Sequence, residues 1–222
     1  MPAPLHVERL QTPRTARLVS LAGREPADVR YVWLCCHGYG MAVEAFARWF
    51  EALPAHHQAY CPEGLSRFYW GGFDGKPVAS WMTRAERLCE IDDFTGWMDR
   101  VYRRVRGLHP GARVVLLGFS QGAATVMRWT QRGRPPFAHL VLWSGTPPED
   151  IEYAPRDYYA AEKLHARWGD ADELVPWSRA RERFAEVGLP FEHQSFAGGH
   201  RMTGGALLAL AAEIERRDRG GA

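Results

Sequence analysis

Apolar residues along the chain fall into short, uninterrupted runs, and each run is followed by a turn and then by apolar residues at helical spacing. Three runs are strongly apolar and three are weaker, and we predict a strand at each of them: 31–36, 113–117, 139–143, 58–61, 164–168 and 191–196. Runs that are apolar at every position are typical of strands covered on both faces, as in a parallel sheet.

The segments between these runs have the periodicity of amphipathic helices. We predict five helices, at 42–53, 84–108, 123–132, 177–187 and 205–217. In the longest, apolar residues recur from Ile91 to Val105 at three- and four-residue intervals, which forms one apolar stripe. The alternation of strands and helices predicts an α/β fold with a mostly parallel, doubly wound sheet and helices on both faces.

Two segments depart from this alternation. Segment 6–21 alternates loosely between apolar and polar residues, which predicts an antiparallel edge hairpin within residues 1–30. Segment 63–83 combines glycine turn signals with many aromatic residues, which favours a functional loop. The connection 145–162 is too short to hold a large cap domain. We therefore expect residues 1–222 to form a single domain.

Composition and charge narrow the class of protein. Of the 222 residues, 46% are apolar and 24% are charged, which is typical of a globular chain and excludes intrinsic disorder. The formal net charge is only +2, which argues against electrostatic binding of nucleic acid. The four cysteines lack the spacing of zinc sites or redox dithiols, so we expect reduced thiols and no metal.

The hydropathy pattern bears on location. No apolar run approaches the roughly 18 residues that a membrane-spanning helix needs. The first residues lack the basic start and apolar stretch of a secretory signal. We therefore expect a cytoplasmic protein without a membrane span.

A candidate nucleophile follows the second strong run. Residues 118–122 read Gly-Phe-Ser-Gln-Gly, a G-x-S-x-G motif between a predicted strand and a predicted helix. Such a tight turn requires small residues at the two glycine positions of the motif, and it projects the serine hydroxyl beside the positive end of the helix. Ser120 is therefore the predicted nucleophile.

A serine hydroxyl needs a base, and the base needs a carboxylate to orient it. Of the histidines after Ser120, His200 lies in a glycine-rich loop between the last strand and the last helix, so we predict it as the base. The turn after strand 164–168 offers Asp170, Asp172 and Glu173, and position alone does not choose among them.

Three stretches together resemble the carboxylesterase/phospholipase family of α/β-hydrolases, which includes the acyl-protein thioesterases. They are the G-x-S-x-G motif, the sequence G-x-x-D-x-x-V-P at 169–176, and Gly-His at 199–200. The resemblance runs from about residue 31 to the last helix and implies an α/β-hydrolase fold. In the family motif the carboxylate stands three residues before Val-Pro, which implies Asp172 as the acid.

The sequence His-Gly-Tyr-Gly at 37–40 ends the first strong strand, where this fold places part of an oxyanion hole. Two backbone N–H groups must face the developing negative charge, and one comes from the residue after the nucleophile. That residue is Gln121, and the resemblance implies Tyr39 as the second donor. His37 precedes the serine, and we expect it to orient this loop.

Aromatic residues of segment 63–83 would line an apolar acyl pocket if the segment covered Ser120; otherwise they would form a small core of their own. They are Phe68, Tyr69, Trp70, Phe73 and Trp81.

We expect a serine carboxylic-ester hydrolase that acts on small to medium acyl esters through an acyl-enzyme. The alternatives are a thioesterase on acyl-protein or acyl-CoA, which would share the machinery, and a non-catalytic ligand-binding scaffold. The expected partner is a small-molecule ester, and no cofactor is implied. The resemblance is also compatible with a homodimer.

Overall fold

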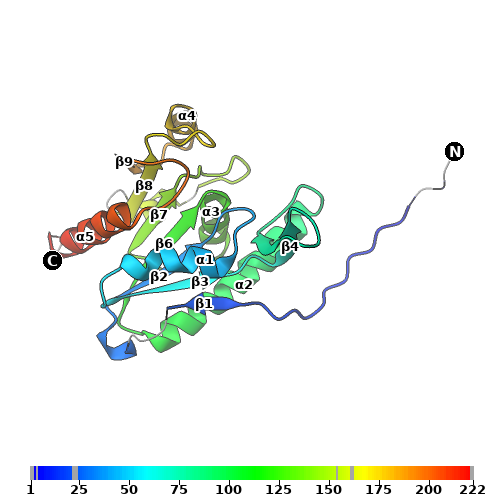
Figure 1. The fold of residues 1–222 in the computed structure, drawn as a ribbon, viewed down its shortest axis with the longest axis horizontal. Coiled ribbons are helices and arrows are strands. Elements are labelled where there is room, and N and C mark those ends of the chain that lie inside the picture. Colours follow the sequence, from blue (N-terminus) through cyan, green and yellow to red (C-terminus); the bar gives the residue numbers. More distant parts are fainter. Residues whose placement is uncertain (1–2, 4, 22–24, 154, 161–162, 221–222) are drawn as a thin grey trace.

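A seven-stranded sheet forms the centre of the protein in the computed structural model, which describes residues 3, 5–21, 25–153, 155–160 and 163–220 (Figure 1). The strands lie in the order β1-β3-β2-β6-β7-β8-β9, and all neighbours except β1 and β3 are parallel. Their bounds are β1 Leu18–Ser20, β2 Tyr31–Cys36, β3 His57–Pro62, β6 Arg113–Phe119, β7 His139–Trp143, β8 Leu164–Gly169 and β9 Glu192–Phe196. The six predicted strands and the parallel α/β fold are confirmed.

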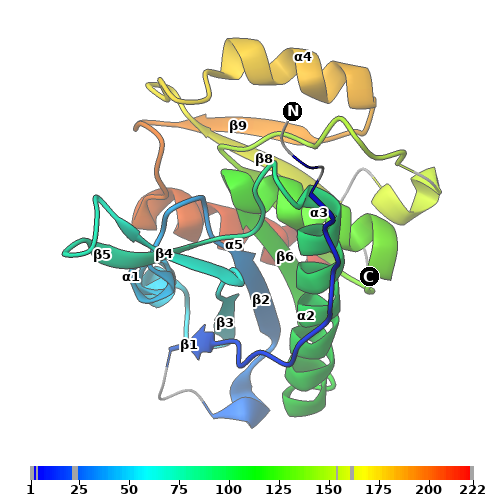
Figure 2. The same ribbon diagram turned by 90° about the vertical axis from the view of Figure 1, so that its right-hand side faces the viewer.

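Helices cover both faces of the sheet (Figures 1 and 2). Apolar residues of α2, α3 and α4 pack on one face, and those of α1 and α5 pack on the other. The bounds are α1 Val43–Arg48, which continues as a 3₁₀ helix over Trp49–Ala52, α2 Arg87–Leu108, α3 Gln121–Gly133, α4 Trp177–Val187 and α5 Gly204–Gly220. All five predicted helices are present.

Strand β2 shows why its sequence is apolar throughout. Val32 and Leu34 belong to the core beneath α2 and α3, whereas Trp33 and Cys35 belong to the core beneath α1 and α5. Side chains alternate between the faces of a strand, so a strand with two covered faces needs apolar residues at every position.

The prediction of an amino-terminal hairpin is wrong. Within 5–21 the structure has one strand, β1, and it pairs antiparallel with β3 rather than with a neighbouring segment. Residues 5–17 form no strand. From β1 this segment runs outward, away from the rest of the chain (Figure 1), and Arg9 pairs with Glu86. The loose alternation reflects a largely exposed segment, which has no buried face to set a strict period. Residues 1–2, 4 and 22–24 lie outside the described part.

The predicted aromatic loop is instead a hairpin. β4 (Ser66–Trp70) and β5 (Lys76–Ser80) pair antiparallel in a separate two-stranded sheet. Gly71 and Gly72 have φ values of +85° and +106°, which explains the glycines at the turn. Because every residue of β4 is partly or fully exposed, its sequence lacks a clear apolar alternation. An isolated bridge between Met41 and Ala79 ties the hairpin to the loop after β2.

The described residues between β7 and β8 hold one short element, a 3₁₀ helix over Arg156–Tyr159. Within the described chain, no helix combines the length and the apolar character that crossing a membrane requires.

Candidate active site

Ser120 lies between β6 and α3, at the edge where the parallel strands end. Its backbone has φ 53° and ψ −118°, which is unfavourable for a residue with a side chain, and its N–H donates to the Trp143 carbonyl at 2.9 Å. A Cβ at Gly122 would lie 2.1 Å from the carbonyl oxygen of Cys36, and one at Gly118 would lie 2.3 Å from the carbonyl oxygen of Gly122. The two glycines of the motif are therefore required by close backbone packing around the serine.

His200 connects Ser120 to Asp172. Its Nε2 lies 3.0 Å from Ser120 Oγ, and its Nδ1 lies 2.9 Å from Asp172 Oδ2. Since an ionised carboxylate only accepts hydrogen bonds, the neutral imidazole carries its proton on Nδ1 and leaves Nε2 to accept the serine hydroxyl. The chain of contacts has the geometry that activates a serine by proton transfer.

Asp172 is the carboxylate that His200 contacts among the three that the sequence offered. Its side chain is 0% exposed, and its Oδ1 accepts the backbone N–H of Val175 at 2.9 Å. Asp170 is exposed and accepts the Gly198 N–H at 3.0 Å, and Glu173 is also exposed. The Val-Pro sequence after Asp172 thus supplies a backbone donor that holds the carboxylate in place.

The two predicted oxyanion donors flank Ser120. Gln121 is the first residue of α3, and Tyr39 lies in a loop that packs against the serine, since a Cβ at neighbouring Gly38 would lie 3.2 Å from Ser120 Cβ. The Gln121 side chain accepts the Trp81 N–H at 3.2 Å and donates to the Met82 carbonyl at 3.1 Å. These bonds fix the start of α3 against the segment after β5.

His37 forms no hydrogen bond with Ser120, His200 or Asp172 in the described part of the chain. Its Nε2 accepts the backbone N–H of Gly64 at 2.9 Å, so its proton lies on Nδ1, which donates to the Gly38 carbonyl at 2.7 Å. Burial lowers the pKa of His37, which favours this neutral form. Both ring nitrogens are used in ordering the loop that carries Tyr39.

The five aromatic residues predicted for a pocket do not come together. Trp81 is 1% exposed, packs on Phe94 and donates its indole N–H to the His37 carbonyl at 2.8 Å. Phe68 and Trp70 lie on β4 with ring centroids 5.5 and 5.9 Å from that of Tyr39.

Three of the five aromatic residues are at the surface: Tyr69 and Trp70 are both 56% exposed, and Phe73 at the hairpin turn is 96% exposed. The structure therefore brings the five together neither as one pocket nor as one small core. The reason is that the segment folds as a hairpin beside the site and continues into the core only at Trp81.

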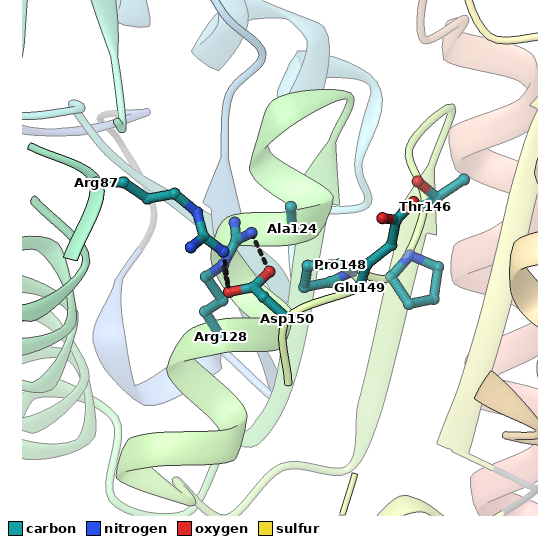
Figure 3. A pocket seen from close by; sticks show the side chains of 8 residues that line it. Arg87, Ala124, Arg128, Thr146, Pro148, Glu149 and Asp150 are labelled. Carbon is teal, nitrogen blue, oxygen red and sulfur yellow. Dashed lines mark hydrogen bonds and ion pairs between the residues drawn. The ribbon is translucent and has the colours of Figure 1, made fainter. Parts of the chain in front are cut away.

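A cavity that sequence reasoning missed lies along the first turns of α3 (Figure 3). It measures about 360 Å³ and is lined by Arg87, Ala124, Arg128, Thr146, Pro147, Pro148, Glu149 and Asp150. Nothing in the sequence around Arg128 marks it as part of a site, because it lies in a helix whose other residues are largely buried. The available signal was the acidic pair at 149–150, which follows β7 at the carboxyl edge of the sheet.

A group that could be considered for a metal lies at the opposite end of the strands. His56, His57 and Glu215 offer ligand atoms within 4.8 Å of one another. However, Trp33 donates its indole N–H to His57 Nδ1 at 3.0 Å, so the neutral ring carries its proton on Nε2, toward Glu215 Oε1 at 3.0 Å. A metal-bound histidine normally donates its second nitrogen's proton, so this arrangement fits a hydrogen-bonded cluster better than a metal centre.

Comparisons with known proteins agree with this fold. A family model described as the alpha/beta hydrolase fold matches residues 31–170, and the chain belongs to that family. No curated protein sequence matches the chain.

Solved structures with the same fold include two kinds of esterase. Acyl-protein thioesterase 2 from Zea mays is 17% identical with a TM-score of 0.68, over 91% of this chain and 99% of that one. A Bacillus cereus carboxylesterase is 15% identical with a TM-score of 0.63, over 91% and 94% of the two chains. A Mesorhizobium loti carboxylesterase is 16% identical with a TM-score of 0.61, over 89% and 93%.

Proposed function

We propose that the protein is a serine hydrolase of carboxylic esters. The observation that carries this proposal is the continuous chain of contacts from Ser120 through His200 to Asp172, with both distances near 3 Å. The backbone conformation of Ser120 supports it, because strained backbone persists where the surrounding structure imposes it and clusters at active sites. We also propose that the chain forms one domain and works in the cytoplasm, in keeping with its four free cysteines.

The proposed reaction begins with Ser120. Its Oγ attacks the ester carbonyl carbon while His200 Nε2 takes the hydroxyl proton, and Asp172 stabilises the imidazolium that forms. The backbone N–H groups of Gln121 and Tyr39 would donate to the oxyanion. His200 then gives the proton to the departing alcohol oxygen as the C–O bond breaks, which leaves an acyl-enzyme.

Water completes the cycle. His200 takes a proton from the water, the hydroxyl attacks the acyl carbon, and the proton returns to Ser120 Oγ as the acid leaves. The order of steps needs no group outside the chain, the ester and water.

The first test is hydrolysis of p-nitrophenyl esters from acetate to palmitate. Ser120→Ala should lower kcat at least about a thousandfold. A matched control is Ser144→Ala. Ser144 also has a positive φ, 48°, at the same edge of the sheet, and its buried hydroxyl has no hydrogen-bond partner in the described part.

The control should keep its activity, because replacing a buried hydroxyl that makes no hydrogen bond costs little. Equal activity of Ser120→Ala and the parent would refute the proposed nucleophile. A chain-length optimum at small or medium acyl groups is expected, and a maximum at palmitate would contradict it.

A thioesterase is the second candidate, favoured by the fold shared with the Zea mays acyl-protein thioesterase. Measuring kcat/KM for oxygen esters and thioesters with the same acyl chain would separate the two functions: an esterase should have the higher value for the oxygen ester, and a thioesterase the higher value for the thioester. A folded protein without activity on either would instead favour a non-catalytic ligand-binding scaffold.

A further inference from the structure

The cavity beside α3 lies along the helix that begins directly after the proposed nucleophile. Ala124 and Arg128 are spaced four residues apart, so they follow one another along the same face of α3, whereas Ser120 precedes the helix with a non-helical backbone. Seven residues at 1.5 Å each put Arg128 about 10 Å along the axis from Gln121, the first residue of α3. The opposite wall, 146–150, follows β7 at the same edge of the sheet, where a Cβ at Gly145 would lie 2.3 Å from the Ser120 carbonyl oxygen.

Two arginines share one carboxylate at the far end of this cavity. Arg128 binds Asp150 with two hydrogen bonds, Nη2 to Oδ1 at 2.6 Å and Nε to Oδ2 at 3.2 Å. Arg87, the first residue of α2, pairs with Oδ2 of the same carboxylate (Figure 3). Burial opposes the ionisation of Asp150, but the hydrogen bond and charge of Arg128 outweigh it and hold its pKa below the usual value. Asp150 is therefore an anion at neutral pH and balances only one of the two arginines.

The two arginines have more N–H groups than the single carboxylate of Asp150 can accept. Within the described chain Asp150 is the only acidic partner of Arg87 and Arg128, and a guanidinium has five N–H groups. Glu149 also lines the cavity, but its exposed side chain forms no contact with either arginine in the close-up view (Figure 3). The Arg128 side chain is only 9% exposed, and the positive charge there is screened less than at an open surface.

We infer that this cavity binds an anionic group of the substrate, a carboxylate or a phosphate, through Arg87 and Arg128. The inference rests on the proposed function, because it places the anion about two helical turns from the reacting ester. Arg87 and Arg128 then determine specificity: the planar fork of a guanidinium matches the oxygens of either anion, and the bound group supplies the missing negative charge.

The test compares p-nitrophenyl monoesters of dicarboxylic acids, from succinate to sebacate, with analogues whose far carboxylate is a neutral primary amide. The parent should prefer the charged member of each pair by on the order of tenfold or more in kcat/KM, with the largest preference at the chain length that spans the cavity. Arg87→Gln should reduce this ratio toward one, because the charged member of each pair loses one of its two arginine partners. Equal rates for charged and neutral members in the parent would overturn the inference.

A second variant acts in the opposite direction. Asp150→Asn removes the internal competitor and leaves both arginines, so the preference for the charged ester should rise above that of the parent. If Arg87, Arg128 and Asp150 only fasten the loop to the helices, both variants should lower the thermal midpoint and neither should change the charged-to-neutral ratio.

Binding separates this inference from the proposed function. Calorimetric titration of Ser120→Ala with suberate and with octyl phosphate needs no turnover, and it shows which anion the cavity prefers. Binding that Arg87→Gln abolishes, in a protein that hydrolyses no ester, would support the anion site and refute the esterase. Hydrolysis of neutral esters without binding of either anion would support the esterase and refute the anion site.

Discussion

The indole N–H of Trp81 donates to the carbonyl oxygen of His37 across 2.8 Å. This bond joins the end of the β4–β5 hairpin to the loop that carries Tyr39, so it connects a buried core residue to a proposed oxyanion donor. We expect Trp81→Phe to lower the free energy of unfolding by about 1–3 kcal/mol and to reduce kcat, because the loop loses a fixed support.

The matched control for Trp81→Phe is Trp129→Phe. Trp129 is also fully buried and donates its indole N–H at 2.8 Å, but to Asp99 on α2. It should lose similar stability and keep its kcat. Denaturant unfolding and ester hydrolysis measure the two effects, and an equal loss of activity in both variants would contradict the role of Trp81 in the loop.

Gly122 allows α3 to approach β2. A Cβ there would lie 2.1 Å from the Cys36 carbonyl oxygen, and backbone cannot yield as a flexible side chain does. Gly122→Ala should therefore destabilise the protein by at least about 2 kcal/mol and shift Ser120 away from His200.

Gly96→Ala in α2 is the opposite case, since a Cβ there meets nothing within 4 Å. It should stabilise the protein by up to about 1 kcal/mol. Thermal midpoints of the two variants test the pair, and a tolerated Gly122→Ala would show that the helix can shift without loss.

His139 makes stability depend on pH. Burial lowers its pKa to about 4 and the neighbouring His165 acts in the same direction, while Asp218 opposes the shift and Arg113 adds to it. Between pH 6.5 and 4 the unfolded chain binds more protons than the folded one, so stability should fall as the pH falls through this window, by up to about 3 kcal/mol. Urea unfolding at several pH values should show this decline, and the decline should be smaller in His139→Gln.

Glu213 should cause a second loss of stability at lower pH. Burial raises its pKa, but the hydrogen bond with His165 and the charge of Arg167 outweigh this and lower it to about 2. A lowered carboxyl pKa stabilises the folded state above pH 4.5, and this contribution is lost as the pH falls toward 2. This loss of stability should remain in His139→Gln and become smaller in Glu213→Gln, which separates the two groups by their pH windows.

The cluster of His56, His57 and Glu215 should behave as a hydrogen-bonded structural element. Glu215→Gln should lower the free energy of unfolding by about 1–3 kcal/mol, because a charged acceptor shared by two imidazoles is lost. Zinc should leave the thermal midpoint unchanged relative to a chelator control. A rise in the midpoint with zinc that Glu215→Gln abolishes would show that the cluster binds metal after all.

The sheet could be predicted because its physics is local. Strand β2 is apolar at every position since both of its faces are covered, and that requirement is written into six consecutive residues. The turn around Ser120 could be predicted for a similar reason: backbone atoms pack so closely against Gly118 and Gly122 that only glycine fits at either position. The contact of Asp172 with His200 was expected only through a family resemblance, since Asp170 and Glu173 occupy the same turn.

Other features depend on contacts between distant segments. Trp81 and Phe73 are both aromatic residues of one segment, yet one is 1% and the other 96% exposed, because the hairpin's position beside the main sheet decides their surroundings. Arg87, Arg128 and Asp150 come from two helices and a loop and meet only in the folded chain. Neither the exposure of these aromatic residues nor the arginine–aspartate cluster follows from a periodic pattern in the sequence.

Helix α5 supplies acidic side chains to strands made much earlier in the chain. Asp218 reaches His139 at the start of β7, and Glu213 reaches His165 and Arg167 in β8. During synthesis these buried groups of the sheet have no carboxylate from α5 until residue 218 has left the ribosome. The order of translation therefore makes the packing of α5 a late event, and the emerging chain must keep a nearly finished sheet soluble while that helix is still missing.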